Sequence, residues 1–144
     1  MTNQIKWSTP GSIVSVLTTE LNALANNTLS ALGPVYDNTG SARHQYVDIE
    51  LVLASLTPTA GGYISLYAAL AVDGTNYGDA KRESMQQLVG IFNLDTAAAA
   101  KRTSLRNILL PPDLMKFYVD NQAGVALGGT LNTVKVVPYN PEIQ

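Results

Sequence analysis

The sequence predicts a mainly β protein, an antiparallel β-sandwich or barrel preceded by one amphipathic helix. Three observations predict this class. After residue 27 the apolar residues follow a period of two, and about seven short stretches of this kind are separated by turns rich in glycine, proline and asparagine. Strands and helices do not alternate, which argues against a parallel α/β sheet. A length of 144 residues fits one domain over residues 1–144.

The N-terminal segment is predicted to be a loose arm over residues 1–8, followed by a helix over about residues 10–25. Thr9 suits the N-cap and Pro10 suits the first helical position. Apolar residues then follow at spacings of three and four, as on one face of an amphipathic helix: Ile13, Val16, Leu17, Leu21 and Leu24. The asparagine pair at 26–27 is expected to end the helix, because asparagine tolerates the left-handed conformation.

The clearest predicted strand lies at residues 45–53, where apolar and polar residues alternate. Its expected core residues are Val47, Ile49, Leu51 and Leu53, with Tyr46, Asp48 and Glu50 on the opposite face. A second strand is predicted at 63–72, with Ile64, Leu66, Leu70 and Val72 facing the core. The remaining strands are expected within 28–36, where Gly33 and Pro34 interrupt the strand, and at 87–94, 103–109, 115–120 and 131–138.

The C-terminal tail, residues 138–144, is predicted to be extended. Prolines at positions 138 and 141 exclude a central strand, because proline lacks the N–H group that a sheet needs. We expect both terminal segments either to pair with a neighbouring chain or to fray. The apolar residues of the arm that would make such a contact are Ile5 and Trp7.

The composition excludes several classes of protein. Charged residues make up 14% of the chain and the net charge is −2, whereas disordered chains combine low hydrophobicity with high charge. A pI near 5.2 argues against a nucleic-acid partner. The longest apolar run is about the length of a strand, so no membrane partner is expected. The polarity is mostly neutral and comes from threonine, asparagine, serine and glutamine.

Catalytic and metal-binding patterns are weak, so the chain is not expected to be an enzyme. His44 is the only histidine, and no serine lies in a Gly-x-Ser-x-Gly motif. The alternating acids Asp48 and Glu50 are typical of a solvated strand face. The loop at 73–79 carries oxygen-bearing side chains, but its spacing favours a turn over a calcium site. With no cysteine in the chain, no metal and no cofactor are expected.

Basic residues gather at two places that have the character of loops. They form either a solvated rim or a charged contact with an acidic partner surface. Together with the two apolar residues of the arm, they are the candidate partner-contact residues: Ile5, Trp7, Lys81, Arg82, Lys101, Arg102 and Arg106.

Several segments resemble small virion structural proteins of tailed bacteriophages, the capsid decoration or cement proteins. They lie at residues 18–25, 46–51, 70–77, 106–108, 111–112, 121–126 and 132–135. The resemblance extends over about residues 7–139 and implies a jelly-roll-like β-sandwich that coats the capsid. It also implies a homo-oligomer, with a trimer favoured, bound to the major capsid protein on the outer surface of the virion. Such a virion is assembled in the host cytoplasm, and the family carries no catalytic residues.

An alternative function is a sandwich module of a tail, neck or head fibre that binds host-surface glycans. This function needs aromatic side chains clustered at one end of the sandwich, for which Tyr63, Tyr67 and Tyr77 are the candidates. A small depolymerase is the third hypothesis and ranks last. The low content of charge favours a surface that is covered by copies of the chain or by a shell protein, since charges are depleted from interface cores.

Overall fold

The structure, a computed structural model, describes residues 5–41, 43–84 and 86–143. Residues 1–4 of the predicted arm and residue 144 of the predicted tail lie outside this part. The described chain is mainly β, as predicted. Its strands are β1 (Ile5–Trp7), β2 (Val14–Leu17), β3 (Thr28–Leu29), β4 (Val35–Asp37), β5 (Tyr46–Leu56), β6 (Tyr63–Ala71), β7 (Gln87–Asn93), β8 (Ala99–Leu109), β9 (Leu114–Gln122), β10 (Thr133–Tyr139) and β11 (Pro141–Ile143). Two 3-10 turns are described, η1 (Thr19–Leu21) and η2 (Arg82–Ser84).

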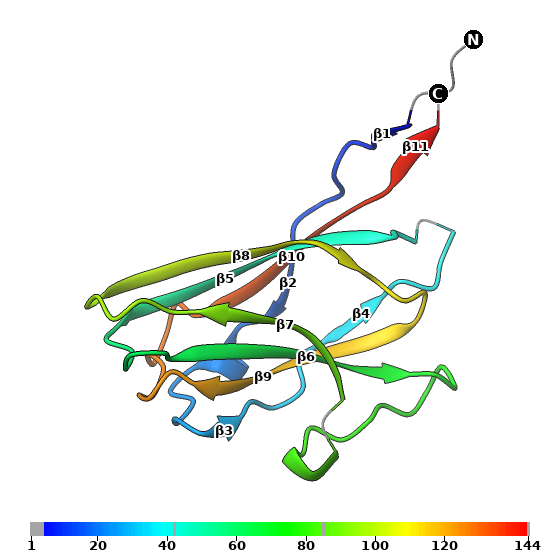
Figure 1. Cartoon of the computed structure of the whole chain (residues 1–144). Coiled ribbons are helices and arrows are strands. Elements are labelled where there is room, and N and C mark those ends of the chain that lie inside the picture. Colours follow the sequence, from blue (N-terminus) through cyan, green and yellow to red (C-terminus); the bar gives the residue numbers. More distant parts are fainter. Residues whose placement is uncertain (1–4, 42, 85, 144) are drawn as a thin grey trace.

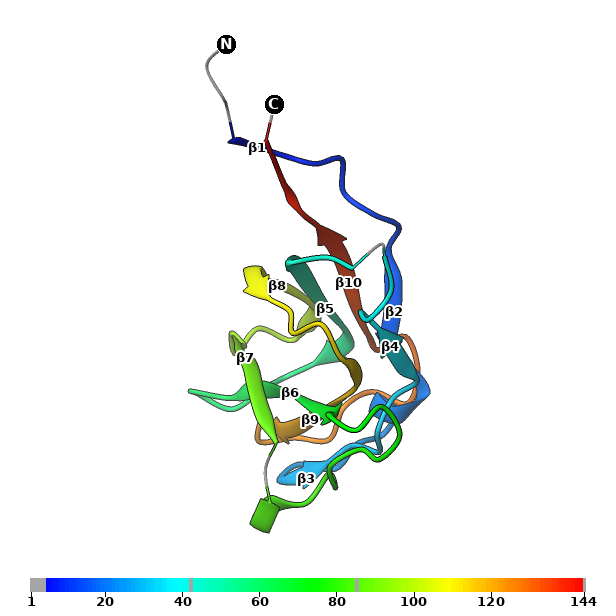
Figure 2. The same cartoon turned by 90° about the vertical axis from the view of Figure 1, so that its right-hand side faces the viewer.

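The described strands pair antiparallel in two larger sheets and one small ribbon. One sheet has the order β2-β10-β5-β8, and the other has the order β3-β9-β6-β7, with β4 also paired to β9. Figures 1 and 2 show the two sheets facing each other, while the ribbon of β1 and β11 extends away from them. Strands pair from the two ends of the chain inward: β2 with β10, β4 with β9, β5 with β8, and β6 with β7.

The core lies between the two sheets and follows the predicted alternation. In β5, every second side chain is buried, and these are the four residues expected there: Val47, Ile49, Leu51 and Leu53. The facing sheet contributes Ile64 and Leu66 from β6 and Phe117 from β9. Burial of such apolar side chains is the main driving force for packing the two sheets together.

The helix predicted over residues 10–25 is wrong. This segment forms β2 and η1 instead, and the backbone N–H of Gly11 already donates to the carbonyl oxygen of Pro138 at 2.7 Å. Ile13, which was expected on the buried face, is 68% exposed. The apolar spacing of three and four fits a strand followed by a turn equally well. Pairing with β10 decides between them, because valine and isoleucine favour strands and the edge of β10 supplies hydrogen-bond partners.

Two smaller expectations also differ from the structure. Val72 was expected in the core but is 85% exposed, because β6 ends at Ala71 and the chain turns there. The strand predicted to begin at residue 103 begins at Ala99, since β8 continues along β5 as far as the pair Leu56 and Ala99. The basic pair at 101–102 therefore lies within a strand. Among the described residues, no helix has the length and apolar character needed to cross a bilayer.

Three buried asparagines hold the loops onto the sheets. The Asn38 amide donates to the carbonyl oxygens of His44 and Pro111, and its oxygen accepts the N–H of His44. The Asn121 amide donates to the carbonyl oxygens of Leu24 and Val125 at 2.9 Å. Asn132 works in the same way, accepting the N–H of Ala54 and donating to the carbonyl oxygen of Gly128. These side chains satisfy backbone groups of half-buried residues.

Candidate interaction surfaces

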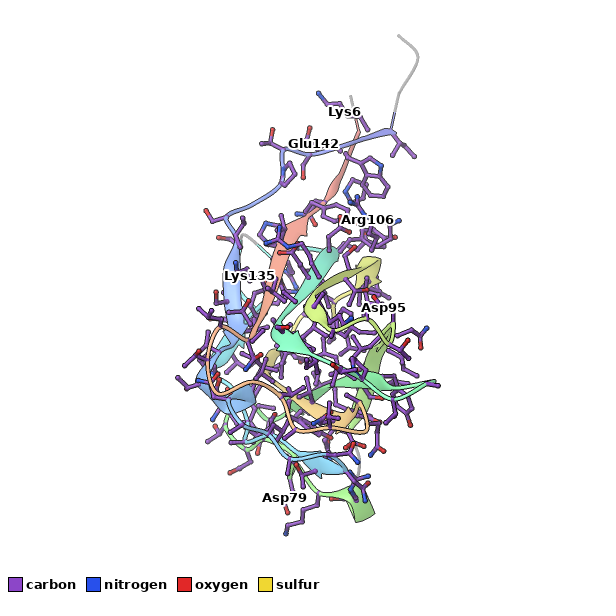
Figure 3. All side chains as sticks on the ribbon, turned by 90° about the vertical axis from the view of Figure 1, so that its left-hand side faces the viewer. Lys6, Asp79, Asp95, Arg106, Lys135 and Glu142 are labelled. Atoms are coloured by element: carbon purple, nitrogen blue, oxygen red, sulfur yellow. The ribbon has the colours of Figure 1, made fainter. Side chains whose placement is uncertain are left out.

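Both ends of the described chain meet in one ribbon. Strand β1 pairs with β11 in the register Ile5 with Ile143, Lys6 with Glu142, and Trp7 with Pro141. The ion pair Lys6–Glu142 spans it at 3.9 Å, and Figure 3 shows both residues on the projecting segment. Ile5 is 78% exposed, so its side chain gains little from the sandwich. The ribbon is thus the part of the described chain that stands farthest from the core (Figure 1).

Three aromatic rings meet where the ribbon joins the sandwich, and we call them the aromatic corner. Tyr46 of β5 and Tyr139 of β10 are opposite each other in register and stack at 6.0 Å between ring centroids. The Trp7 ring is nearly perpendicular to both, at 5.7 Å from Tyr46 and 5.3 Å from Tyr139. These edge-to-face contacts anchor the base of β1. Trp7 nevertheless remains 59% exposed.

A polar network adjoins the aromatic corner. The Tyr139 hydroxyl lies 2.5 Å from Asn107 Oδ1 and 3.2 Å from Asp48 Oδ1, and the backbone N–H of Asn107 donates to the same Asp48 oxygen at 3.0 Å. Asn107 has a φ of +56° where the register of β5 and β8 shifts. Burial, and then the Asp48 charge, raise the pKa of Tyr139, so its hydroxyl keeps its proton at neutral pH.

Charged side chains cover the outer face of β5, β8 and β10. Arg106 Nη1 lies 3.6 Å from Asp48 Oδ2, and Arg102 Nε lies 3.5 Å from Glu50 Oε1. Lys135 of β10 is opposite Glu50 in register. These five residues and Ile13 line a groove of about 490 Å³. In Figure 3, Arg106 lies nearer the ribbon than Lys135 does.

A smaller hollow of about 220 Å³ connects the groove to the aromatic corner. It shares Asp48 and Arg106 with the groove, and it adds Trp7, Asn107 and Tyr139. The structure therefore brings together three of the predicted contact residues, which are Trp7, Arg102 and Arg106. Sequence reasoning missed the other two members of the aromatic corner, Tyr46 and Tyr139, because positions 7, 46 and 139 become neighbours only through strand register.

Lys101 does not belong to this surface. Its side chain is buried on the inner side of β8, and its ammonium donates to Asp95 Oδ1 and to the carbonyl oxygen of Ala97, both at 2.6 Å. The hydrogen bond from Lys101, together with the N–H of Ala97, lowers the pKa of Asp95. The Lys101 ammonium thus secures the turn before β8 from within.

Lys81 and Arg82 lie in the loop between β6 and β7, as predicted, and both form ion pairs within the chain. Lys81 Nζ lies 3.0 Å from Asp79 Oδ2. Arg82 Nη2 lies 2.6 Å from Asp120 Oδ1, and Asp120 is almost fully buried on β9. The backbone N–H of Gln86 donates to the Tyr118 hydroxyl at 3.0 Å. The contacts with Asp120 and Tyr118 fasten the loop to the outer face of the second sheet, whereas the Lys81–Asp79 pair lies within the loop.

Two of the three tyrosines expected to form a glycan platform, Tyr67 and Tyr77, have contacts within the chain. The Tyr67 ring stacks on Tyr118 at 5.3 Å between centroids. The Lys116 ammonium lies 4.5 Å from the centroid of the Tyr77 ring, a cation–π contact. At least one face of the Tyr67 ring and of the Tyr77 ring is thus used within the chain. At the aromatic corner, by contrast, the Trp7 ring is 59% exposed, while Tyr139 is buried.

The remaining candidates for chemistry have structural partners. His44 is half-buried, and its backbone binds the Asn38 amide. Asp73 accepts the N–H groups of Thr75 and Asn76, and these bonds, with one from the Asn76 side chain, lower the pKa of Asp73 to about 2. Within residues 5–41, 43–84 and 86–143, no three His, Cys, Asp or Glu side chains gather as a metal site.

Comparisons with known proteins identify no family. No family model matches the chain, and no curated protein matches it. A solved structure from the full particle of Israeli acute paralysis virus, heated to 63 degrees, is 12% identical over 99% of this chain and 72% of that chain. Its TM-score is 0.26, and a value this low carries no argument. The resemblance to phage capsid proteins therefore stays a prediction.

Proposed function

We propose that this chain is a virion structural protein, a capsid decoration or cement protein of a tailed bacteriophage. It binds the major capsid protein on the outer surface of the shell and stabilises the shell without enzymatic activity. The observation that carries this proposal is the terminal ribbon of β1 and β11, which extends from the sandwich (Figure 1). The ribbon exposes the side chains of Ile5 and Trp7.

A free ribbon of this kind is expected to need a partner. Two-stranded sheets are marginally stable in water on their own, and their open edges pair readily with other strands. In this chain the Trp7 end of β1 is anchored at the aromatic corner, whereas Ile5 is largely exposed. An edge of a shell protein would supply both the missing hydrogen bonds and an apolar contact for Ile5.

The strand order supports the same proposal. We infer that the sandwich is a jelly roll, because its strands pair from the ends of the chain inward and fill two facing sheets. Viral capsid domains and lectin domains both use this architecture. A fold alone does not assign a function, so the ribbon, and not the jelly roll, carries the proposal.

Co-sedimentation with capsids that lack the protein tests this function. The wild-type chain is expected to pellet with such capsids, and Ile5→Asp is expected to weaken binding at least tenfold, because a carboxylate would be buried without a partner. Leu131→Asp is the matched control. Leu131 is 79% exposed, and it lies in the loop before β10, at the end of that strand away from the ribbon.

Light scattering tests the oligomeric part of the proposal. The resemblance favours a homotrimer, and a trimeric mass for the isolated chain would support it. A chain that is monomeric at all concentrations and also fails to pellet with capsids would overturn the proposed function. Pelleting of Ile5→Asp at the wild-type level would overturn the role of the ribbon.

A further inference from the structure

We propose that the groove on the outer face of β5, β8 and β10 binds a short acidic oligosaccharide, with one sugar ring at the aromatic corner. This inference goes beyond the virion role and does not depend on it. It rests on one juxtaposition: an exposed indole, a half-buried network of hydrogen-bonding groups, and a row of charged side chains along one continuous depression.

The aromatic corner provides the surface on which a sugar ring stacks. A pyranose has a face of C–H groups and a rim of hydroxyls, so it packs its C–H face on an aromatic ring. The Tyr46 and Tyr139 rings lie nearly perpendicular to the Trp7 ring and contact it, which fixes its plane before a ligand arrives. A ring that is fixed in this way loses little entropy on binding. More than half of the Trp7 surface is still open to solvent.

The adjoining polar groups suit the hydroxyl rim of a sugar. Asp48 Oδ2 lies 3.6 Å from Arg106 Nη1, which is longer than a hydrogen bond, so a hydroxyl can approach both groups. Asp48 Oδ1 is already held by the N–H of Asn107 and lies close to the Tyr139 hydroxyl. These bonds fix the direction of the Asp48 carboxylate, so an acceptor and a donor stand side by side beside the indole.

The length and charge of the groove define the class of ligand. Tyr139 and Lys135 are four residues apart on β10, a distance of roughly 14 Å along a strand, so the site is longer than one sugar ring. Three cations line the groove against two carboxylates, and these are Arg102, Arg106 and Lys135 against Asp48 and Glu50. The excess of one positive charge favours a saccharide that carries a carboxylate.

A glycan array with neutral and acidic oligosaccharides, probed with the isolated chain, tests the proposal. Acidic glycans are expected to bind, and neutral glycans of the same length are expected to bind at least several-fold more weakly. Trp7→Ala is expected to weaken binding at least tenfold, and Lys135→Gln is expected to remove the preference for acidic glycans. Leu88→Ala, at an exposed apolar position on β7 of the other sheet, is the matched control.

Fluorescence keeps the test independent of whether Trp7→Ala folds. Trp7 is the only tryptophan in the chain, so its emission reports on this site alone. An acidic glycan selected on the array is expected to shift the emission of the wild-type chain and to protect it from iodide quenching. A blank array, binding confined to neutral glycans, or binding that leaves the Trp7 emission unchanged would overturn the proposal. Capsid co-sedimentation is a separate measurement, so the two proposals fail independently.

Discussion

At the scale of single residues, buried asparagine side chains replace regular backbone pairing in the loops. Asn121 is fully buried, and every polar atom of its side chain is hydrogen-bonded. The amide nitrogen donates to the carbonyl oxygens of Leu24 and Val125, and the amide oxygen accepts the N–H of Ala123. A side chain of this type satisfies backbone groups without introducing a charge, which would cost far more to bury. Part of the neutral polarity of this chain therefore serves the interior and not a covered surface.

Removal of the Asn121 amide is predicted to destabilise the protein strongly. Asn121→Ala removes the partners of the Val125 carbonyl oxygen and of the buried Ala123 N–H, and it leaves the Leu24 carbonyl oxygen with the Leu127 N–H alone. It should therefore lower the free energy of unfolding by about 2–4 kcal/mol. Asn93→Ala, at an exposed position on β7, should change it by less than about 0.5 kcal/mol. Urea denaturation measures both variants. Equal midpoints for the two variants would contradict the role of Asn121.

The Asp73 carboxylate gives a prediction for pH dependence. Its pKa is about 2 in the folded chain, because backbone and side-chain N–H groups of Thr75 and Asn76 donate to the ionised form. The unfolded chain has the ordinary value, near about 4. The carboxylate therefore stabilises the fold above pH 4, and this contribution disappears as the pH falls to 2.

Carboxyl NMR titration is the direct measurement of this pKa, and the Asp73 midpoint is expected near 2. The pH-dependent part of the stability difference between the wild type and Asp73→Ala should be fully present well above pH 4 and should be lost as the pH falls through 2. A midpoint near the ordinary pKa of aspartate would show that the turn at residues 73–76 does not stabilise the ionised Asp73 carboxylate.

For single residues, the sequence predicts which side chains are buried better than it predicts which groups they contact. The alternation in β5 identifies Val47, Ile49 and Leu51 as core residues, because every second side chain of a strand points to the same face of the sheet. Lys101 was expected at a solvated rim or a partner contact because its segment has the character of a loop. Hydrogen bonds to the carbonyl oxygen of Ala97 and to the carboxylate of Asp95 make the burial of Lys101 favourable, and no local sequence pattern predicts these contacts.

At the scale of elements, β2 and η1 take the place of the helix predicted over residues 10–25. Local spacing favoured it, but β2 gains its hydrogen bonds from β10, which lies more than a hundred residues away. The loops that follow β2 depend on close backbone approaches. Gly33 shows this most clearly, because its N–H donates to the carbonyl oxygen of Phe117 at 2.8 Å, while its other side faces the backbone of β2.

A side chain at Gly33 is predicted to disrupt this close approach between the loop and the backbone of β2. A methyl group there would meet the carbonyl oxygen of Val16 and the Leu17 side chain, so Gly33→Ala should destabilise the fold by about 1–3 kcal/mol. A methyl group at Gly129 meets no heavy atom within 4 Å, so Gly129→Ala should have an effect below about 0.5 kcal/mol. Thermal melts compare the two variants. A Gly33→Ala variant as stable as the wild type would show that the loop lies farther from the backbone of β2 than the structure has it.

At the scale of the whole molecule, the class of fold follows from the sequence and the pairing of its strands does not. Turn residues and periodicity locate the strands from β5 to β10, because both signals are local. The aromatic corner joins positions 7, 46 and 139, and the ribbon joins the two ends of the chain. Such contacts are set by sheet register, so the surfaces that carry both proposals emerge only from the folded chain.

We propose that this chain coats a virion through its terminal ribbon. The most direct measurement is the position of the chain in an assembled particle at side-chain resolution. We expect density for the ribbon of β1 and β11 against the major capsid protein on the outer surface, with Ile5 buried in the contact. A particle without this chain, or one in which the ribbon points into solvent and Ile5 stays exposed, would contradict the claim.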